Sequence, residues 1–189
     1  MSHVNTNLAS EFWFFSQLHR LGYNPFITLG NTKAVDIAIK LKDGTTLSFD
    51  VKGKESFSRG TYPYLPDDTE LQIKGCFTDS HYFVFVDLGI SINKDNMRTI
   101  LDREPRCFFI KSINLKNIAR KWFPANGGNG GYGFDPKLLW LCKQSAQNDK
   151  ISNKVIDRLK KDYDIEEIKK VIMTLAEFEE TFHGQKRPY

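Results

Sequence analysis

The sequence has few cysteines, and they lie far apart. Only three of the 189 residues are cysteines, at positions 76, 107 and 142. No two of them form a Cys-x-x-Cys pair, so the sequence indicates neither a zinc site nor a disulfide framework. Long hydrophobic runs are also missing, because the longest, at residues 82–86, is far too short to span a membrane. The N-terminus has no basic segment followed by an apolar run, so we expect no signal peptide and a cytoplasmic protein.

Two other kinds of site are poorly represented. The four histidines, His3, His19, His81 and His183, show neither metal-ligand spacing nor a companion serine or cysteine at a recognisable elbow. The glycine-rich stretch 126–133 formally fits G-x-G-x-x-G, but it lacks the preceding strand that a dinucleotide site requires. The formal net charge of +4 is mild, so it permits nucleic-acid binding without indicating it.

The residues that are present predict one mixed α/β domain spanning residues 1–189. The composition, 40% hydrophobic and 13% aromatic, is that of a soluble globular protein. Hydrophobic periodicity predicts a helix at 7–21, followed by strands at 24–29, 34–41 and 46–52. Further strands are expected at 81–88 and 106–111, and helices at 114–123, 152–161 and 165–182. We expect a core over about 7–145 with one central sheet, and a C-terminal helical extension over about 150–183.

The first helix is expected to begin at Asn7 as N-cap and to end before Gly22. Its apolar stripe is predicted to contain Leu8, Glu11, Phe12, Phe15 and Leu18. Because Trp13 and Phe14 are apolar on the other side, we expect the whole helix to be well buried.

Two of the predicted strands form a hairpin whose register the sequence constrains. Val35, Ile37, Ile39 and Leu41 share one face of the first strand, and Leu47, Phe49 and Val51 share one face of the second. A three-residue loop, Lys42-Asp43-Gly44 with Gly44 left-handed, pairs apolar with apolar residues, whereas a two-residue loop mixes the faces. The predicted pairs are therefore Val35 with Val51, Ile37 with Phe49, and Ile39 with Leu47.

This register places three polar residues together on the opposite face: Asp36, Asp50 and Lys52. Asp36 is expected directly opposite Asp50, where the Cβ atoms of facing residues lie about 4.5–5.5 Å apart and like charges repel. A bound divalent cation reverses the sign of that repulsion. Two carboxylates beside an ammonium are what a magnesium-dependent phosphodiester-cleaving site needs.

Together these residues resemble the PD-(D/E)xK nuclease superfamily, in a poorly characterised bacterial branch. The resemblance covers residues 7–53, with Glu11 on a first helix, Asp36 on a strand and Asp50-Val51-Lys52 on the next strand. Val35 stands where the superfamily often has proline, and Asp50 replaces the commoner glutamate. The resemblance implies a restriction-endonuclease-like core: a central mixed sheet flanked by helices, with an N-terminal helix, antiparallel strands and C-terminal helices.

The resemblance also implies an activity, that of a Mg²⁺- or Mn²⁺-dependent endonuclease acting on nucleic acid, with DNA as the expected substrate. Asp36, Asp50 and the Val51 carbonyl are the predicted metal ligands. Glu11 is expected to bind a second metal directly or through water, and Lys52 to orient the attacking water or offset phosphate charge. A homodimer is compatible with this activity, because cutting both strands usually takes two sites.

Alternative interpretations stay open at this point. Asp36 and Lys52 also fit an exposed cross-strand ion pair of little energetic value, and Glu11 also fits the first-turn preference of acids for the helix dipole. Lys33, Lys54 and Arg59 flank the predicted site and fit either phosphate contacts or ordinary surface charge. A non-catalytic nucleic-acid-binding or assembly module, or a partner of a toxin or effector, accounts for the same residues without turnover.

Overall fold

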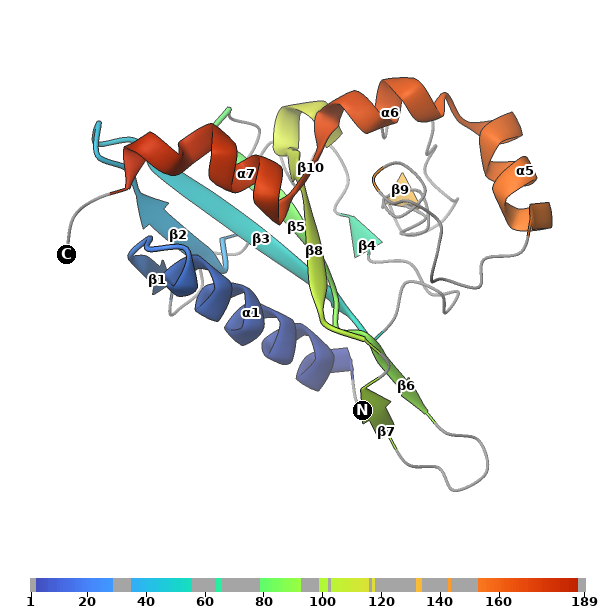
Figure 1. The fold of residues 1–189 in the computed structure, drawn as a ribbon, viewed down its shortest axis with the longest axis horizontal. Coiled ribbons are helices and arrows are strands. Elements are labelled where there is room, and N and C mark those ends of the chain that lie inside the picture. Colours follow the sequence, from blue (N-terminus) through green and yellow to red (C-terminus); the bar gives the residue numbers. More distant parts are fainter. Residues whose placement is uncertain are drawn as a thin grey trace.

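The computed structural model describes residues 3–28, 35–55, 64–65, 79–92, 99–101, 103–115, 117, 132–133, 143 and 153–186. Its centre is a six-stranded mixed sheet with strand order β1-β2-β3-β5-β8-β10, and helices α1 and α7 lie along it (Figure 1). All neighbouring strands are antiparallel except β3 and β5, which are parallel. The predicted fold class, a mixed α/β domain with a central mixed sheet flanked by helices, is confirmed.

The first helix and the strands predicted at 24–29, 34–41, 46–52, 81–88 and 106–111 occur in the predicted order, and the structure adds β4, β6, β7, β9 and β10. The N-terminal half contains α1 (His3–Arg20), β1 (Pro25–Ile27), β2 (Ile37–Lys40), β3 (Thr46–Lys54), β4 (Tyr64–Leu65) and β5 (His81–Asp87). It is followed by β6 (Ile90–Ile92), β7 (Thr99–Leu101), β8 (Arg106–Lys111) and β9 (Tyr132–Gly133). The C-terminal part contains α5 (Asn153–Asp162), α6 (Ile165–Val171), β10 (Ile172–Thr174), α7 (Leu175–Phe182) and the 3₁₀ turn η1 (His183–Gln185). Strands β6 and β7 form a separate hairpin that extends away from the main sheet (Figure 1).

Helix α1 ends before Gly22, as the sequence predicts, but it begins at His3, so the prediction of Asn7 as its N-cap is wrong. Gly22 has a φ of 83°, a left-handed conformation that glycine adopts without a Cβ penalty. The backbone N–H of Tyr23 donates to the carbonyl of Leu18 at 3.0 Å, and the N–H of Gly22 donates to the carbonyl of His19 at 2.9 Å. These two bonds make a Schellman motif, which satisfies the last carbonyls of the helix and turns the chain into β1.

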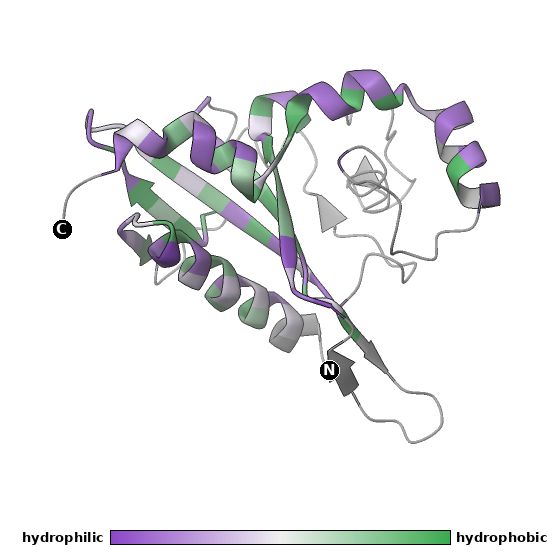
Figure 2. Ribbon diagram, in the orientation of Figure 1, coloured by the Kyte–Doolittle hydropathy of each residue, from purple (hydrophilic) through white to green (hydrophobic). Residues whose placement is uncertain are grey.

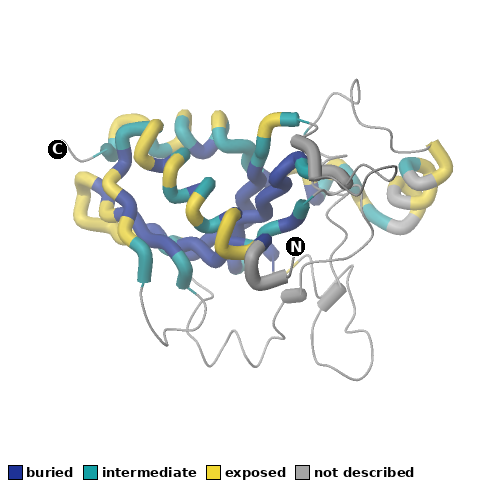
Figure 3. The backbone as a smooth tube through the Cα atoms, turned by 90° about the horizontal axis from the view of Figure 1, so that it is seen from below, coloured by how far each residue is buried: buried dark blue, intermediate teal, exposed yellow. Residues whose placement is uncertain are grey.

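Both helices that lie along the sheet pack on the same face of it. Phe14 of α1 meets Phe49 of β3 edge-on at 5.2 Å between ring centroids, and Phe178 of α7 stacks on Phe109 of β8 at 4.6 Å. Figure 2 shows hydrophobic residues concentrated on the central strands, and Figure 3 shows those strands buried while exposed residues recur along the helices. The core therefore lies between the sheet and the α1–α7 layer.

The sequence prediction of the buried face of α1 is only partly correct, because Leu18 is buried and Phe15 packs against the core but Leu8 and Phe12 do not. The side chains that α1 buries are Thr6, Ser10, Phe14 and Leu18, which recur every four residues. Leu8 and Phe12, which were expected in the buried stripe, are instead exposed on the outer side. Both sides of this helix carry apolar residues, so periodicity alone does not choose between them. The helix is consequently half-buried rather than buried all round.

The single helix predicted at residues 165–182 is also wrong, because a strand interrupts it. Residues 172–174 form β10, which pairs antiparallel with β8 and places Ile172 opposite Ile110. Thr174 then caps α7: its hydroxyl accepts a hydrogen bond from the backbone N–H of Glu177, and the Glu177 carboxylate accepts one from the N–H of Thr174. This segment therefore adds a sheet strand and a core helix rather than a helical extension.

The sheet leaves part of β3 without a neighbour on one side. Strand β2 pairs with β3 only over residues 46–49, although β3 continues to Lys54 and pairs with β5 over residues 48–54. Among the residues that the structure describes, no strand pairs with Asp50, Val51 and Lys52 on the side of β2, and we call this the free edge of β3. Within the described residues, no helix combines the length and the apolar character needed to cross a membrane. Most of the predicted helix at 114–123 and of the glycine-rich stretch at 126–133 lies outside the described residues.

Candidate active site

Asp36 reaches the free edge of β3 through a break in the hairpin ladder. The predicted register holds over β2, with Ile37 opposite Phe49 and Ile39 opposite Leu47, and Gly44 has the expected positive φ of 94°. At Asp36 the backbone N–H also donates to the Phe49 carbonyl, at 2.8 Å, so two residues of this strand face one of β3, as in a bulge. The regular ladder stops there, and neither the predicted pair of Val35 with Val51 nor the predicted pairing of Asp36 directly opposite Asp50 forms in the described ladder.

The side chain of Asp36 takes the place of the missing strand partner. Its Oδ2 accepts a hydrogen bond of 2.7 Å from the backbone N–H of Val51. In a strand, the N–H and the C=O of one residue point to the same side, so the Val51 carbonyl also points toward the edge where Asp36 lies. The aspartate carboxylate and the predicted carbonyl ligand thus lie along one short length of β3.

Asp50 and Lys52 share one face of β3, because side chains two residues apart on a strand point the same way. Asp50 is only 3% exposed, and its Oδ1 lies 2.6 Å from Nζ of Lys52. The ion pair in the structure is therefore between Asp50 and Lys52, whereas the sequence suggested Asp36 and Lys52 as an alternative pair. A carboxylate has two acceptor oxygens, and Lys52 contacts one of those of Asp50, Oδ1.

Glu11 approaches from α1, which lies unusually close to β3. Gly53 makes this approach possible, because a Cβ at that position would meet Oγ of Ser10 at 2.0 Å and the carbonyl oxygen of Thr6 at 2.9 Å. The backbone N–H of Gly53 also donates to the side chain of Asn7, at 3.3 Å. Glycine is needed here for the close approach of two backbones, and the contact carries Glu11 to the same end of β3 as the aspartates.

Burial and the charge of Asp50 raise the pKa of two of the acids, Asp36 and Glu11. Burial, followed by the charge of Asp50, raises the pKa of Asp36 to about 7, although the hydrogen bond from Val51 and the charge of Lys52 oppose the rise. Burial and then Asp50 also raise the pKa of Glu11, against the opposing effect of Lys52. Three acids from three elements therefore share one electrostatic environment in which a single ammonium does not compensate their negative charge.

The excess of negative charge in the acidic cluster indicates whether a cation fits between these residues. Additional positive charge would stabilise the ionised acids, and carboxylate and carbonyl oxygens are the ligands that Mg²⁺ and Mn²⁺ prefer. However, the described residues hold no group of three His, Cys, Asp or Glu side chains placed to ligate one ion. The assignment of Asp36, Asp50, the Val51 carbonyl and Glu11 as metal ligands therefore stays a prediction.

His81 is a member of this cluster that the sequence analysis missed. It begins β5, pairs with Ser48 across the parallel β3–β5 ladder, and its Nδ1 lies 2.8 Å from the Ser48 hydroxyl. It is 1% exposed, and burial lowers its pKa to about 4, with the charges of Asp50 and Lys52 acting in opposite directions. His81 is therefore a neutral imidazole beside the acids. Strand alternation predicts that His81 and Tyr82 point to opposite faces of β5. It does not show that Ser48 and Asp50 lie on the neighbouring strand.

The predicted basic flank is only partly described. Lys33 and Arg59 lie outside the described residues. Lys54 is at the end of β3 and is buried, so it is not ordinary surface charge. The site cation that the structure places among the acids is therefore Lys52.

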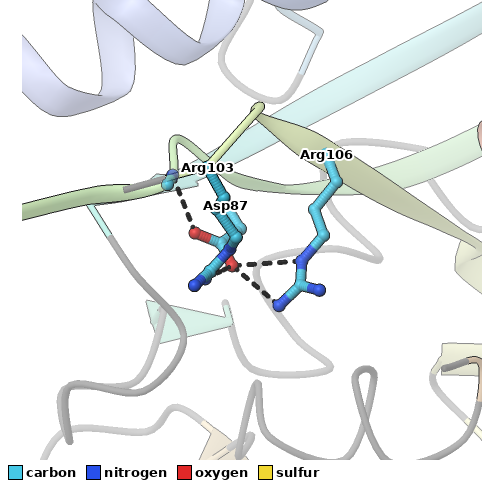
Figure 4. A network of polar contacts seen from close by, with 4 residues as sticks. Asp87, Arg103 and Arg106 are labelled. Carbon is cyan, nitrogen blue, oxygen red and sulfur yellow. Dashed lines mark hydrogen bonds and ion pairs between the residues drawn. The ribbon is translucent and has the colours of Figure 1, made fainter. Parts of the chain in front are cut away.

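A second polar cluster on the sheet has a different character (Figure 4). Asp87, fully buried at the end of β5, accepts hydrogen bonds from Arg103, from the Gly89 backbone N–H at 3.0 Å, and from Nε and Nη2 of Arg106 at 3.2 and 3.1 Å. Here one carboxylate is compensated by two guanidinium groups. This cluster ties β5 to the start of β8 and has no excess of negative charge for a metal to neutralise.

Comparison with known proteins adds no relative. No family model matches the chain, no curated protein is similar to it, and no solved structure matches its fold. Membership of the PD-(D/E)xK superfamily therefore stays a prediction from the residues.

Proposed function

We propose that this protein is a metal-dependent nuclease that hydrolyses phosphodiester bonds, with DNA as the preferred substrate. The observation that carries the proposal is the electrostatic coupling of Glu11, Asp36 and Asp50 around one short part of β3, where Nζ of Lys52 lies 2.6 Å from Oδ1 of Asp50. These residues come from a helix and two strands, and they are the ones that the resemblance to the nuclease superfamily singles out.

Each residue has a role that its position supports. Asp36, Asp50 and the Val51 carbonyl would hold Mg²⁺ or Mn²⁺. When bound, such a cation supplies Lewis-acid polarisation of a phosphate oxygen and activation of water. Lys52, which is partly exposed, places an ammonium where it offsets negative charge on the phosphate. Glu11 orders water at the rim of the same edge. His81 on the neighbouring strand β5 bonds to Ser48, which precedes Asp50 by two residues on β3.

The test is cleavage of DNA and RNA by the purified protein in the presence of Mg²⁺ or Mn²⁺. Asp36→Asn and Lys52→Ala should each abolish cleavage while leaving the circular dichroism spectrum unchanged. Asp157→Asn on α5 and Lys40→Ala on β2 are matched controls, because both residues are exposed and lie outside the acidic cluster. If varied DNA and RNA substrates stay intact with either metal, the proposal is wrong.

One observation favours a second candidate, a non-catalytic nucleic-acid-binding or assembly module with the same fold. The 2.6 Å ion pair already supplies Asp50 with a cation from within the chain. If Lys52 serves as a permanent counter-ion, the protein should bind nucleic acid in a salt-sensitive way. Its melting temperature should then not respond to millimolar Mg²⁺ or Mn²⁺, whereas a metal-binding native state should be stabilised.

A further inference from the structure

Phe26 is a large aromatic residue that the fold leaves open to solvent on the edge strand β1. Its side chain is 49% exposed, and among the described residues only Leu8 and Phe12 are comparably exposed large apolar side chains. Single exposed apolar residues are common on protein surfaces, so exposure alone carries no argument. Phe26 differs from the other exposed apolar residues in its position relative to the acidic cluster.

The sheet register places Phe26 on the same face as Asp50. Phe26 pairs with Ala38 of β2, and Ala38 pairs with Ser48 of β3, so the three side chains point to one face. Asp50 follows Ser48 by two residues and shares that face. The row formed by Phe26, Ala38 and Ser48 therefore runs across the sheet directly beside the acids.

Phe26 is also one diagonal step from Asp36. The backbone N–H of Thr28 donates to the Asp36 carbonyl at 3.1 Å, which makes Thr28 the neighbour of Asp36 across the β1–β2 pair. Phe26 precedes Thr28 by two residues and so points to the same side of β1. Diagonal neighbours of this kind lie about 7–8 Å apart, within reach of an aromatic side chain.

The row between the ring and β3 contains only a small side chain, that of Ala38. Ala38 contributes only a methyl group, and Ser48 turns its hydroxyl to His81. A flat exposed ring beside a phosphate-binding site has the shape and chemistry to stack on a nucleobase, because every base offers a π-face. In a nucleotide one sugar joins the base to its phosphate, so a base next to the phosphate at the acids can reach a ring one diagonal away.

We propose that Phe26 is a substrate-contacting residue on which one unstacked base next to the scissile phosphate stacks. This inference rests on the proposed nuclease function and deepens it, since it selects a substrate class. A base inside a regular duplex is stacked on its neighbours and is not available to the ring. The preferred substrate is therefore single-stranded DNA or a duplex that is distorted at the cleavage point.

The test measures binding without turnover. A labelled single-stranded oligothymidine is titrated with the protein in EDTA, so affinity is obtained whether or not the protein cleaves. Phe26→Ala should weaken binding about 5- to 150-fold, which corresponds to the worth of one base–aromatic stack. Phe26→Trp should restore it, and the added indole fluorescence should be quenched by the oligonucleotide. Phe12→Ala is the matched control, because Phe12 is 55% exposed on the outer side of α1, and it should change affinity less than about twofold.

Abasic oligonucleotides separate stacking from other roles of Phe26. When the base at the critical position is missing, the wild-type protein and Phe26→Ala should bind with the same affinity. The stacking proposal is overturned if Phe26→Ala binds the intact oligonucleotide as the wild type does, or if Phe12→Ala loses as much. It is equally overturned if Phe26→Ala alters the oligomeric state in sedimentation instead of the affinity, because Phe26 then belongs to an interface between copies.

The two proposals fail in different ways. If Phe26 supports binding but no metal allows cleavage, the nuclease function falls and the stacking contact stands. If the protein cleaves DNA while Phe26→Ala leaves KM and kcat unchanged on single strands, the stacking contact falls and the nuclease function stands.

Discussion

The Oδ2 atom of Asp36 lies 2.7 Å from the backbone nitrogen of Val51, where a regular hairpin would have placed a strand carbonyl. One side chain therefore ends the β2–β3 ladder and also brings a carboxylate to the proposed metal-binding edge. Because that carboxylate is buried next to Asp50, its pKa is raised to about 7.

Two groups of the cluster should make opposite contributions to the pH dependence of stability. Between pH about 4 and 7, the folded protein keeps a proton on Asp36 that the unfolded chain has lost, so the free energy of unfolding falls as pH rises. Between pH about 4 and 6.5, the unfolded chain binds a proton on His81 that the folded protein does not, so this contribution rises with pH.

Single variants should expose each contribution in metal-free buffer. Asp36→Asn should become more stable from pH 4 toward 6.5, while His81→Gln, which keeps a polar group near Ser48, should become less stable from pH 4 toward 7. Urea unfolding at a series of pH values measures both slopes. If the free energy of unfolding of both variants changes with pH as that of the wild type does, these two residues are not the titrating groups.

Removal of the Lys52 ammonium should strengthen metal binding even though it abolishes cleavage. Nζ of Lys52 lies 2.6 Å from Oδ1 of Asp50 and competes with a cation for that oxygen. We expect Lys52→Met to lower the Kd for Mn²⁺ by about tenfold, equivalent to about 1.4 kcal/mol. Calorimetric titration measures the change, with Lys40→Met as the control on the exposed end of β2. Weaker binding in Lys52→Met would mean that Lys52 instead holds Asp50 in position for the ion.

A side chain at position 53 should force α1 away from β3. The added Cβ of Gly53→Ala meets Oγ of Ser10 at 2.0 Å and a backbone oxygen at 2.9 Å, so the backbone must shift. We expect the free energy of unfolding to fall by about 1–3 kcal/mol, the usual cost of overpacking. Chemical denaturation measures it, and Gly184→Ala is the control, because its Cβ would meet nothing within 4 Å. Equal effects of the two substitutions would contradict the close approach of α1 at Gly53.

The cap that starts α7 should contribute measurably to stability. The Thr174 hydroxyl accepts from the Glu177 N–H at 3.3 Å, and Oε2 of Glu177 accepts from the Thr174 N–H at 2.7 Å. Thr174→Ala should lower the free energy of unfolding by about 0.5–2 kcal/mol, whereas Thr174→Ser should retain most of it. If alanine and serine destabilise equally, the threonine methyl group rather than the cap is responsible.

The hairpin that carries the candidate site could be predicted because its signals are local. Apolar residues alternate on both strands and Gly44 permits the left-handed turn, so only one register keeps each face uniform. Asp36, Asp50 and Lys52 therefore followed from the residues. What this argument did not predict is the bulge at Asp36, since it depends on the hydrogen bond between its side chain and the backbone of β3.

The buried side of α1 was not decided by local sequence. The helix has apolar residues all round, and the side that packs is the one with Ser10 and Thr6, because these residues fit against Gly53. Leu8 and Phe12, the more hydrophobic choices, stay outside. In the same way, residues 165–182 have helical periodicity throughout, but residues 172–174 form a strand because they pair with β8.

By itself, the sequence determined the mixed α/β class and the register of the hairpin, because alternation and turn chemistry act over a few residues. The tertiary structure decided which side of α1 packs, that His81 and Ser48 meet from positions 33 residues apart, and that Asp36 titrates near pH 7. These depend on strand order, burial and charge from distant segments, which no short stretch of sequence contains.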